Sequence, residues 1–339
     1  MSSTQGIVDR KELLGDTYDK VNHKNYIKTR LNDLVYGKSI SSSYPYGLFK
    51  VNDCRDGLLS TLYFTFKVND NAIPAFLDRY FSYHNRANNF LKKYVLVGDR
   101  YITADANYIL SGKIYTPEKK EQQKIANFFS TLDKKIEQLK QKKAYLDEYK
   151  KGIMQKIFAQ ELRFKDENGN DFPDWTNQKL GDIAYKNSSN IAANAIEENF
   201  GDYKIYGASG VLKKVDFYKE KEEYISIVKD GAGVGRVFLC EANTSVLGTL
   251  DIIKAKETNL YYLFYFLQQT NFLKYVTGST IPHIYFSDYK SEKILVPIKE
   301  EQEKIANFLS TIDEKISRTQ AQVVNTQEYK KGLLQKMFV

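Results

Sequence analysis

The chain has 339 residues, with 42% hydrophobic and 14% aromatic side chains and a formal net charge of +8. This composition excludes a disordered chain, which would be poorer in aromatic and branched apolar residues, and the length allows two domains of ordinary size. The excess charge lies in residues 1–158, whereas residues 159–298 carry 16 basic and 19 acidic side chains, so bulk charge supports nucleic-acid binding only weakly.

The first block, residues 1–117, has short apolar runs between turn-forming segments. LSTLYFTFK, which begins at Leu59, predicts a β-strand, and FLDRYF, which begins at Phe76, predicts an aromatic helix. Gly98 and Pro117 bracket a last segment in which we expect a loop and a short strand.

Residues 118–158 predict one long amphipathic helix. Its apolar side chains recur every seven residues, and neighbours widen the stripe: Ile125, Leu132, Leu139, Leu146 and Ile153, with Phe128, Phe129, Ile136 and Tyr149. A helix of this length spans ~57 Å, which is too long for one small domain to cover. We therefore expect a helical partner of equal length.

A linker of residues 159–174 leads to the second block, residues 175–298. LGTLDIIK from Leu247 predicts a strand, and YLFYF from Tyr262 predicts a helix. Gly278 and Pro297 match Gly98 and Pro117 at an offset of 180, so the blocks are diverged repeats. The most apolar window, residues 259–273, contains glutamines and is shorter than the ~20 residues of a membrane span, which predicts a buried helix.

Residues 175–207, which begin WTNQKLGDIAYKNSSN, have no counterpart in the first block. The first block is therefore expected to lack an opening segment of about thirty residues or more. The LGD at Leu14 resembles that at Leu180, but aligning the two would break the register further along, and we interpret the likeness as coincidence.

A second long helix is predicted over residues 299–339. Residues 301–338 are identical to residues 121–158 at 20 of 38 positions. The apolar stripe of this helix is shifted relative to that of the first, because Thr319 and Thr326 occupy two positions of the seven-residue repeat. Its apolar members are Ile305, Leu309, Ile312, Ile316, Val323 and Leu333. The second copy is the expected partner of the first, and antiparallel pairing would place the two blocks at opposite ends of a coiled coil. Two unrelated surface helices are the alternative.

Two diverged blocks, each followed by a helix of the pattern EQ-x-KIANF-x-S-x-[LI]-D-x-KI, resemble HsdS, the DNA specificity subunit of type I restriction-modification systems. The resemblance covers essentially the whole chain and implies an α+β fold. Two pseudo-repeated α/β target recognition domains would be separated by two long conserved helices that form an antiparallel coiled coil. The shortened first block, residues 1–117, departs from the family pattern.

The resemblance also implies the partners and the division of labour. Each recognition domain would read one half of a bipartite site in double-stranded DNA, and the coiled coil would set the spacer. Two HsdM methyltransferase subunits and HsdR restriction subunits would dock on the chain. S-adenosylmethionine, ATP and Mg²⁺ would then be bound by those partners, and we expect no cofactor on this chain.

No catalytic or metal-binding pattern is found in the sequence. It contains neither a [DN]PP[YF] box nor a phosphate-binding loop, and no secretory leader is recognised, so a non-catalytic cytoplasmic protein without membrane contact is expected. Glu148 with Lys150, and Glu328 with Lys330, have an E-x-K spacing that we interpret as solvated helix charge. The three histidines form no ligand set, and the two cysteines are interpreted as core thiols in a reducing compartment.

Candidate DNA-binding residues lie on glycine-containing loops, whose backbone can approach phosphate closely. In the second block, KDGAGVGRV offers Lys229, Gly231, Gly233, Gly235 and Arg236, and TGSTIPHIYF offers Ser279, Thr280, His283 and Tyr285. In the first block, the matching candidates are Lys38, Ser42, Tyr44, Tyr46, Arg100, Tyr101, Thr103 and Asn107. Ordinary structural turns remain the alternative for each loop.

The predicted helix–helix and subunit contacts occupy the apolar stripes of both helices. They are Ile125, Phe128, Leu132, Ile136, Leu139, Leu146, Tyr149 and Ile153 in the first helix, and Ile305, Phe308, Ile312, Ile316, Val323, Tyr329 and Leu333 in the second. A coiled-coil adaptor whose end domains bind protein rather than DNA is the alternative function, and the net charge of −3 in residues 159–298 favours it.

Overall fold

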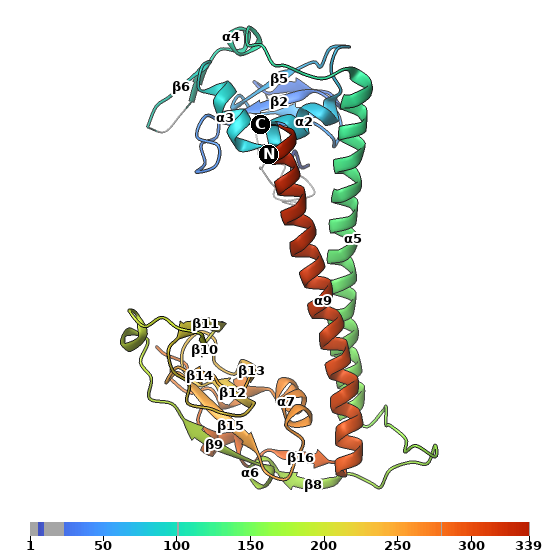
Figure 1. The fold of residues 1–339 in the computed structure, drawn as a ribbon, viewed down its shortest axis with the longest axis vertical. Coiled ribbons are helices and arrows are strands. Elements are labelled where there is room, and N and C mark those ends of the chain that lie inside the picture. The colour runs from blue at the N-terminus through green and yellow to red at the C-terminus, as the bar shows by residue number, and fades with distance from the viewer. Residues whose placement is uncertain (1–5, 10–23, 100–101, 279, 339) are drawn as a thin grey trace. The chain divides into compact units, whose positions relative to one another are not determined.

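The computed structural model describes residues 6–9, 24–99, 102–278 and 280–338, which form two compact units (Figure 1). Unit 1 contains the chain up to Gln141 together with the chain from Gln320 onward, and unit 2 contains Lys142–Thr319. Each unit holds one block of strands and short helices and one part of each long helix. The predicted α+β fold with two long helices is confirmed.

Unit 1 is built on small antiparallel sheets covered by helices. Strand β2 lies between β3 and β5, β1 pairs with β4, and β6 pairs with β7. The strands are β1 (Ile27–Thr29), β2 (Leu34–Gly37), β3 (Leu48–Val51), β4 (Gly57–Leu59), β5 (Tyr63–Phe66), β6 (Val95–Val97) and β7 (Ile102–Ala104). The short helices are α2 (Pro74–Ser82), α3 (His84–Leu91) and α4 (Ala106–Leu110).

Unit 2 has a larger β-system. Its sheets have the strand orders β13-β12-β15-β9, β11-β10-β14 and β16-β8. These strands are β8 (Thr176–Lys179), β9 (Ala184–Ser188), β10 (Tyr203–Gly207), β11 (Gly210–Val215), β12 (Tyr224–Val228), β13 (Val237–Cys240), β14 (Ser245–Val246), β15 (Leu250–Ala255) and β16 (Lys293–Val296). The helices are α6 (Leu180–Ile183), η2 (Asn194–Ile196), α7 (Leu260–Gln269), η3 (Phe272–Tyr275) and α8 (Phe286–Tyr289).

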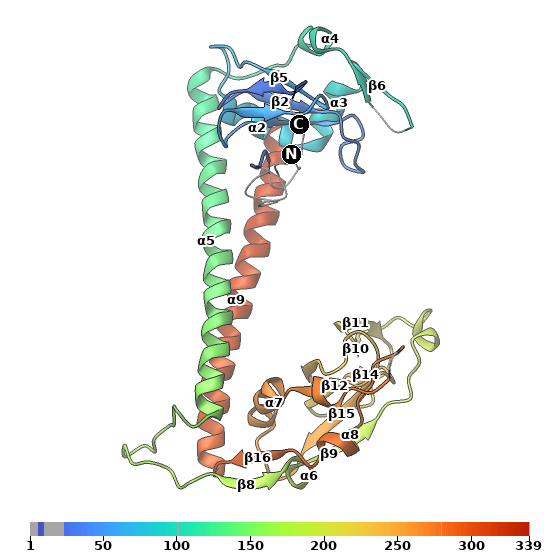
Figure 2. The same ribbon diagram turned by 180° about the vertical axis from the view of Figure 1, so that it is seen from behind.

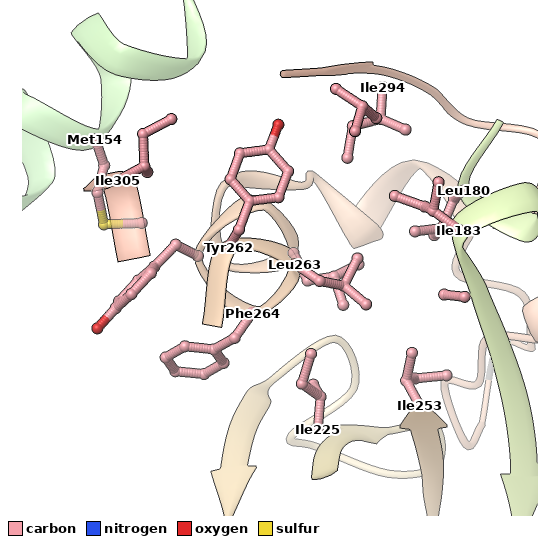
Figure 3. Packing of buried hydrophobic residues seen from close by; sticks show 14 of the residues in the cluster. Met154, Leu180, Ile183, Ile225, Ile253, Tyr262, Leu263, Phe264, Ile294 and Ile305 are labelled. Carbon is pink, nitrogen blue, oxygen red and sulfur yellow. The ribbon is translucent and has the colours of Figure 1, made fainter. Parts of the chain in front are cut away.

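Helix α7 is the centre of the core of unit 2 (Figure 3). Its residues Tyr262 and Leu263 are fully buried, which agrees with the predicted buried helix. The strand residues Ile225 and Ile253 belong to the same core, which extends to Ile305 of the second long helix. Among the described residues, we find no helix with the length and apolar character needed to cross a membrane.

The two long helices are α5 (Lys119–Phe158) and α9 (Lys299–Met337), and they run antiparallel within each unit (Figures 1 and 2). In unit 2, the Lys150 ammonium lies 2.7 Å from the Asp313 carboxylate. In unit 1, Lys330 forms an ion pair with Asp133. These two pairs are equivalent in the sequence repeat, so each unit uses the same antiparallel register. The predicted antiparallel pairing is confirmed.

The predicted apolar stripes are buried to different degrees. The residues Ile136, Leu139, Ile305, Ile312 and Val323 are buried, and a partly buried group flanks them: Ile125, Leu132, Leu146, Ile153, Phe308, Ile316 and Leu333. In contrast, Phe128, Tyr149 and Tyr329 are 42%, 51% and 56% exposed, so their assignment to helix–helix packing is wrong. All three remain predicted subunit contacts only.

A buried glutamine ties each long helix to the aromatic helix of its block. The side-chain carbonyl of Gln302 accepts a hydrogen bond from the Asn259 amide at 2.8 Å, and its amide donates to the Pro297 carbonyl at 2.9 Å. Gln122, its repeat equivalent, does the same with Ile73 and Pro117. Because each glutamine satisfies an amide at the start of α7 or α2, it fixes where that helix begins.

The two cysteines differ in environment. Cys240 is buried beside the Ser226 hydroxyl, and burial raises the pKa of its thiol to about 12, which makes it unreactive. Cys54 is exposed, so its interpretation as a core thiol is wrong. It follows Asn52, which turns the chain by hydrogen bonding to backbone groups rather than by apolar packing.

Candidate DNA interface

The loop between β12 and β13 is a tight turn closed by backbone hydrogen bonds. The Gly235 amide donates to the Val228 carbonyl at 2.8 Å, and the Val228 amide donates to the Arg236 carbonyl at 2.9 Å. Gly231 and Gly235 both have positive φ angles, and a Cβ atom at Gly235 would lie 2.8 Å from Cβ of Phe272. Glycine is therefore required at Gly235 by both conformation and space.

The candidate loop of residues 277–286 packs against the loop between β12 and β13. The Gly231 amide donates to the Pro282 carbonyl at 2.9 Å, and the Ile284 amide donates to the Lys229 carbonyl at 3.0 Å. Thr277 and His283 pair across the base of the second loop, with both backbone hydrogen bonds at 2.9 Å. The two loops, which we predicted separately from the sequence, thus form one surface within unit 2.

The polar side chains of this surface differ in exposure and in their hydrogen-bond partners. Thr280 and Tyr285 are exposed, and the Tyr285 ring lies 5.0 Å from the half-buried His283 ring. The Arg236 side chain is also exposed and donates one hydrogen bond, to the Ala208 carbonyl at 3.3 Å. Ser279 lies outside the described residues. Arginine and tyrosine tips of this kind can hydrogen-bond to phosphate or to base edges.

Lys229 has a structural partner that the sequence did not suggest. Its ammonium lies 3.3 Å from the carboxylate of Asp251, which is only 3% exposed, and Lys186 lies 3.9 Å from the same oxygen. A buried carboxylate needs a compensating charge. The signal that could have revealed this role is the lone acidic residue in the otherwise apolar start of β15.

This pairing separates two variants that the sequence alone would treat together. We expect Lys229→Ala to lower the free energy of unfolding by about 2 kcal/mol, because Asp251 loses its nearer cation. Arg236→Ala should leave the stability within about 0.5 kcal/mol, because the side chain is exposed, and should lower duplex affinity about tenfold. Urea unfolding and DNA titration of both variants check this, and equal stability losses would contradict it.

Among the residues that the structure describes, the candidates of the first block do not form one comparable surface. Tyr44 is only 8% exposed and its hydroxyl donates to the Ser82 carbonyl at 2.9 Å, so its assignment as a base or phosphate contact is wrong. The Tyr46 carbonyl accepts the Tyr36 hydroxyl at 2.7 Å, and the Lys38 ammonium lies 4.5 Å from the centre of the Phe64 ring. Ser42 is exposed.

The remaining candidates of the first block lie near the β6–β7 hairpin. Thr103 is exposed on β7, and Asn107 is exposed on α4. Arg100 and Tyr101 lie outside the described residues. Helix α4 begins after Asp105, whose carboxylate accepts the Tyr108 amide at 2.8 Å and so fixes where Asn107 is presented.

The lysines of the two E-x-K motifs have structural partners. Lys150 and Lys330 form the ion pairs with Asp313 and Asp133, so they are not the solvated helix charges that the sequence suggested. Tyr265 of α7 also donates to Asp313 at 2.8 Å, and Arg79 of α2 lies 2.9 Å from Asp133. Each aspartate therefore joins the two long helices and the aromatic helix of its block.

Comparison with known proteins identifies the family to which this sequence is similar. The model of a family described as the type I restriction modification DNA specificity domain matches residues 13–148 and again residues 173–326. The MjaVIII specificity subunit of a type I restriction enzyme from Methanocaldococcus jannaschii is 32% identical over 203 residues, which cover 55% of this chain and 47% of that protein. The MjaIX specificity subunit of the same organism is 25% identical over 253 residues, which cover 65% and 58%.

These alignments span about half the length of the curated relatives. Among solved structures, the S subunit of a type I restriction-modification system from M. genitalium has the same fold, with a TM-score of 0.63 at 16% identity over 92% of this chain and 84% of that one. The family model covers most of the chain in two copies, each of which includes a block and part of a long helix. The chain therefore belongs to the specificity subunits of type I restriction-modification systems.

Proposed function

We propose that this chain selects the DNA sequence on which a type I restriction-modification complex acts, and that each block reads one half of a bipartite site. The observation that supports the proposal best is the double match of the DNA specificity domain, once over each block. Under this proposal, residues 1–117 and 175–298 are the recognition domains, and residues 118–158 and 299–339 are the conserved helices.

In the second recognition domain, the two joined loops are the proposed reading surface. Gly231 and Gly235 let the backbone approach the sugar-phosphate chain, and Arg236 supplies a cation for phosphate or a guanine edge. Thr280, His283 and Tyr285 supply hydrogen-bonding tips beside it. In the first recognition domain, Ser42, Thr103 and Asn107 are the exposed described candidates that remain.

The long helices are the proposed spacer and docking platform. A helix of 40 residues such as α5 is about 60 Å long, which corresponds to about 18 base pairs. We further propose that two HsdM subunits bind the helices and that HsdR subunits join the assembly. Methylation with S-adenosylmethionine and cleavage with ATP and Mg²⁺ would then be carried out by those partners, with this chain contributing no catalytic group.

The salt dependence of DNA binding tests the proposal. The chain together with its HsdM should bind a duplex that contains its site, and the affinity should fall at least about 10³-fold between 50 and 200 mM salt, because each phosphate contact releases counterions. Fluorescence anisotropy with labelled duplex measures this directly. Binding that is absent, or that does not change with salt, would contradict the proposal.

A protein-binding adaptor is the second candidate function. It is favoured by the net charge of −3 in residues 159–298, which contain the second block. An adaptor of this kind would retain its protein partners after Arg236→Ala and would bind them without DNA. Loss of DNA binding in that variant with intact HsdM binding would argue against the adaptor.

A further inference from the structure

The Asp251 carboxylate is buried on one face of the four-stranded sheet of unit 2 (Figure 1). Asp251 of β15 pairs with Ile227 of β12 on one side and with Ser188 of β9 on the other. Paired residues point to the same face of a sheet, so Asp251 shares its face with the fully buried Ile227. Burial, and secondly the Asp251 charge, raise the pKa of the Tyr289 hydroxyl. A carboxylate in this position needs a compensating cation.

Two lysines reach the same oxygen of this carboxylate. The Lys229 ammonium, directly after β12, lies 3.3 Å from Oδ1 of Asp251, and the Lys186 ammonium, on β9, lies 3.9 Å from it. Lys186 also donates a hydrogen bond to the Ser188 hydroxyl at 2.7 Å. We call these four residues the Asp251 cluster. Lys229 is the nearer cation and compensates the carboxylate, so the charge of Lys186 is in excess.

The Asp251 cluster is continuous with the two joined loops. The Lys229 carbonyl accepts the Ile284 amide at 3.0 Å, so the residue that joins the loops also carries one of the two ammonium groups. Lys186 and Ser188 are exposed on β9, which is an edge strand of the sheet. A duplex that lies on the loops can therefore bring a phosphate to the Lys186 ammonium.

The balance of formal charge makes Lys186 important for this surface. Within residues 229–236 and 277–286, the basic residues are Lys229 and Arg236, and the acidic residue is Asp230. The buried Asp251 adds a second negative charge, so the loops together with this carboxylate have no net charge at neutral pH. Lys186 makes the sum +1. Its ammonium is held by Asp251 and Ser188, so little side-chain freedom is lost when it binds an anion.

We propose that Lys186 binds a phosphate of the DNA backbone and that Asp251 is the positioning residue that holds its ammonium beside the reading loops. The inference rests on the proposed function and extends the DNA-binding surface from the loops to strand β9. Lys229 compensates the buried carboxylate, and Ser188 fixes the direction of the Lys186 side chain. A contact of this kind contributes affinity and register rather than sequence preference.

The proposal is tested with the chain bound to its HsdM, by anisotropy titration of a fluorescein-labelled duplex that carries the recognised site, between about 50 and 200 mM salt. Lys186→Gln should weaken binding about fivefold and reduce the slope of log affinity against log salt by about one, because one phosphate contact is lost. Single base changes in the site should cost the variant and the wild type the same factor. Lys186→Arg should restore the affinity and the slope.

The matched control is Lys165→Gln. Lys165 is an exposed lysine of the linker in the same unit, and its 3.5 Å ion pair with Asp171 is also exposed. The same unit of charge is removed from the chain, but we expect the affinity and the salt slope to stay unchanged. An equal loss of slope in both lysine variants would overturn the proposal, because it would reflect net charge rather than a contact.

Asp251→Asn separates positioning from charge compensation. The change removes a negative charge, so a carboxylate that only offsets its lysines would give tighter DNA binding when it is lost. Positioning predicts the opposite, a loss of about threefold with a smaller salt slope. Ser188→Ala tests the same point at an exposed residue and should weaken binding about twofold without a change in urea unfolding.

Three further results would overturn the inference: an unchanged salt slope in Lys186→Gln, a changed sequence preference in that variant, or tighter binding by Asp251→Asn. Salt-dependent binding of the wild-type chain together with an unaffected Lys186→Gln variant would sink this inference and leave the proposed function standing. A wild-type chain that binds duplex without any salt dependence would overturn both.

Discussion

Replacing Glu301 with alanine is expected to lower the free energy of unfolding of unit 2 by about 3 kcal/mol, whereas replacing Glu121 with alanine should change stability by less than about 0.5 kcal/mol. The two residues are equivalent in the repeat, but only Glu301 is buried and bound by Arg163 and Trp175. Removal of the carboxylate leaves the Trp175 indole and the Nε of Arg163 without an acceptor, while the rest of the guanidinium keeps its bonds to the Phe172 and Pro173 carbonyls. Urea unfolding followed by Trp175 fluorescence measures the effect.

Glu301→Gln is the conservative control. The amide oxygen can still accept one hydrogen bond from Trp175 or Arg163, so the loss should be smaller than that of the alanine variant, about 1–2 kcal/mol. Similar stability losses for the Glu301 and Glu121 alanine variants would mean that the bonds of Arg163 and Trp175 to Glu301 do not stabilise unit 2. A loss of emission intensity in the folded Glu301→Ala protein would show that the indole has moved.

Inserting one heptad into both long helices is expected to abolish recognition of the natural site and to select a site whose spacer is longer by about three base pairs. Seven residues lengthen a helix by about 10.5 Å, and they rotate its far end by only ~20°. Insertions after Gln141 and after Ala321 fall midway between the residues of the two lysine–aspartate ion pairs on each helix, so both pairs are retained. A library of duplexes with random spacers, methylated by the complex with HsdM, identifies the new site.

Three base pairs also turn the duplex by about 100°, which the DNA must absorb by twisting or bending. The affinity for the longer site should therefore be lower than that of the natural chain for its own site. The control is a heptad inserted into α5 alone, which shifts the register of the helices, breaks at least one ion pair and should lower stability. An unchanged spacer after the double insertion would contradict the spacer role.

The long helices and the aromatic helices could be predicted from the sequence because their signal is local. The seven-residue ladder from Ile125 to Ile153 and the repeat at a constant offset both point to paired helices. The direction of pairing was assigned from the family resemblance, since heptads alone do not encode it. The structure adds the physical reason, which is the matched pair of lysine–aspartate bridges between Asp133 and Lys330 and between Lys150 and Asp313.

The contacts that fix the blocks could not be predicted, because they join residues far apart in the chain. Trp175 and Glu301 are separated by 126 positions, and the Gln302 side chain bonds to an amide 43 positions earlier. The repeat signature contained Glu301 and Gln302, but identity between copies does not tell which side chain is buried. Glu301 and Glu121 show this, because the same residue type is buried in one unit and exposed in the other.

The candidate interface was predicted in outline and corrected in detail. Glycine and basic residues located the loop of Gly231 and Gly235 in the second block, and the structure joins it to the loop of His283. The hydroxyl of Tyr44 predicted a DNA contact, but it donates a hydrogen bond to the Ser82 carbonyl inside unit 1. The charge of Lys229 predicted a phosphate contact, but its ammonium already pairs with the buried Asp251 carboxylate. A side chain's partners decide its availability, and these partners are set by tertiary packing.

Sequencing of methylated bases in cells that express this chain with its HsdM tests most directly the claim that two blocks read two half-sites. The account predicts modified adenines within a bipartite motif, two short specific sequences separated by a fixed number of unspecified bases. Arg236→Ala should relax or remove one half of that motif and leave the other. A single uninterrupted motif, or no modified motif at all, would contradict the account.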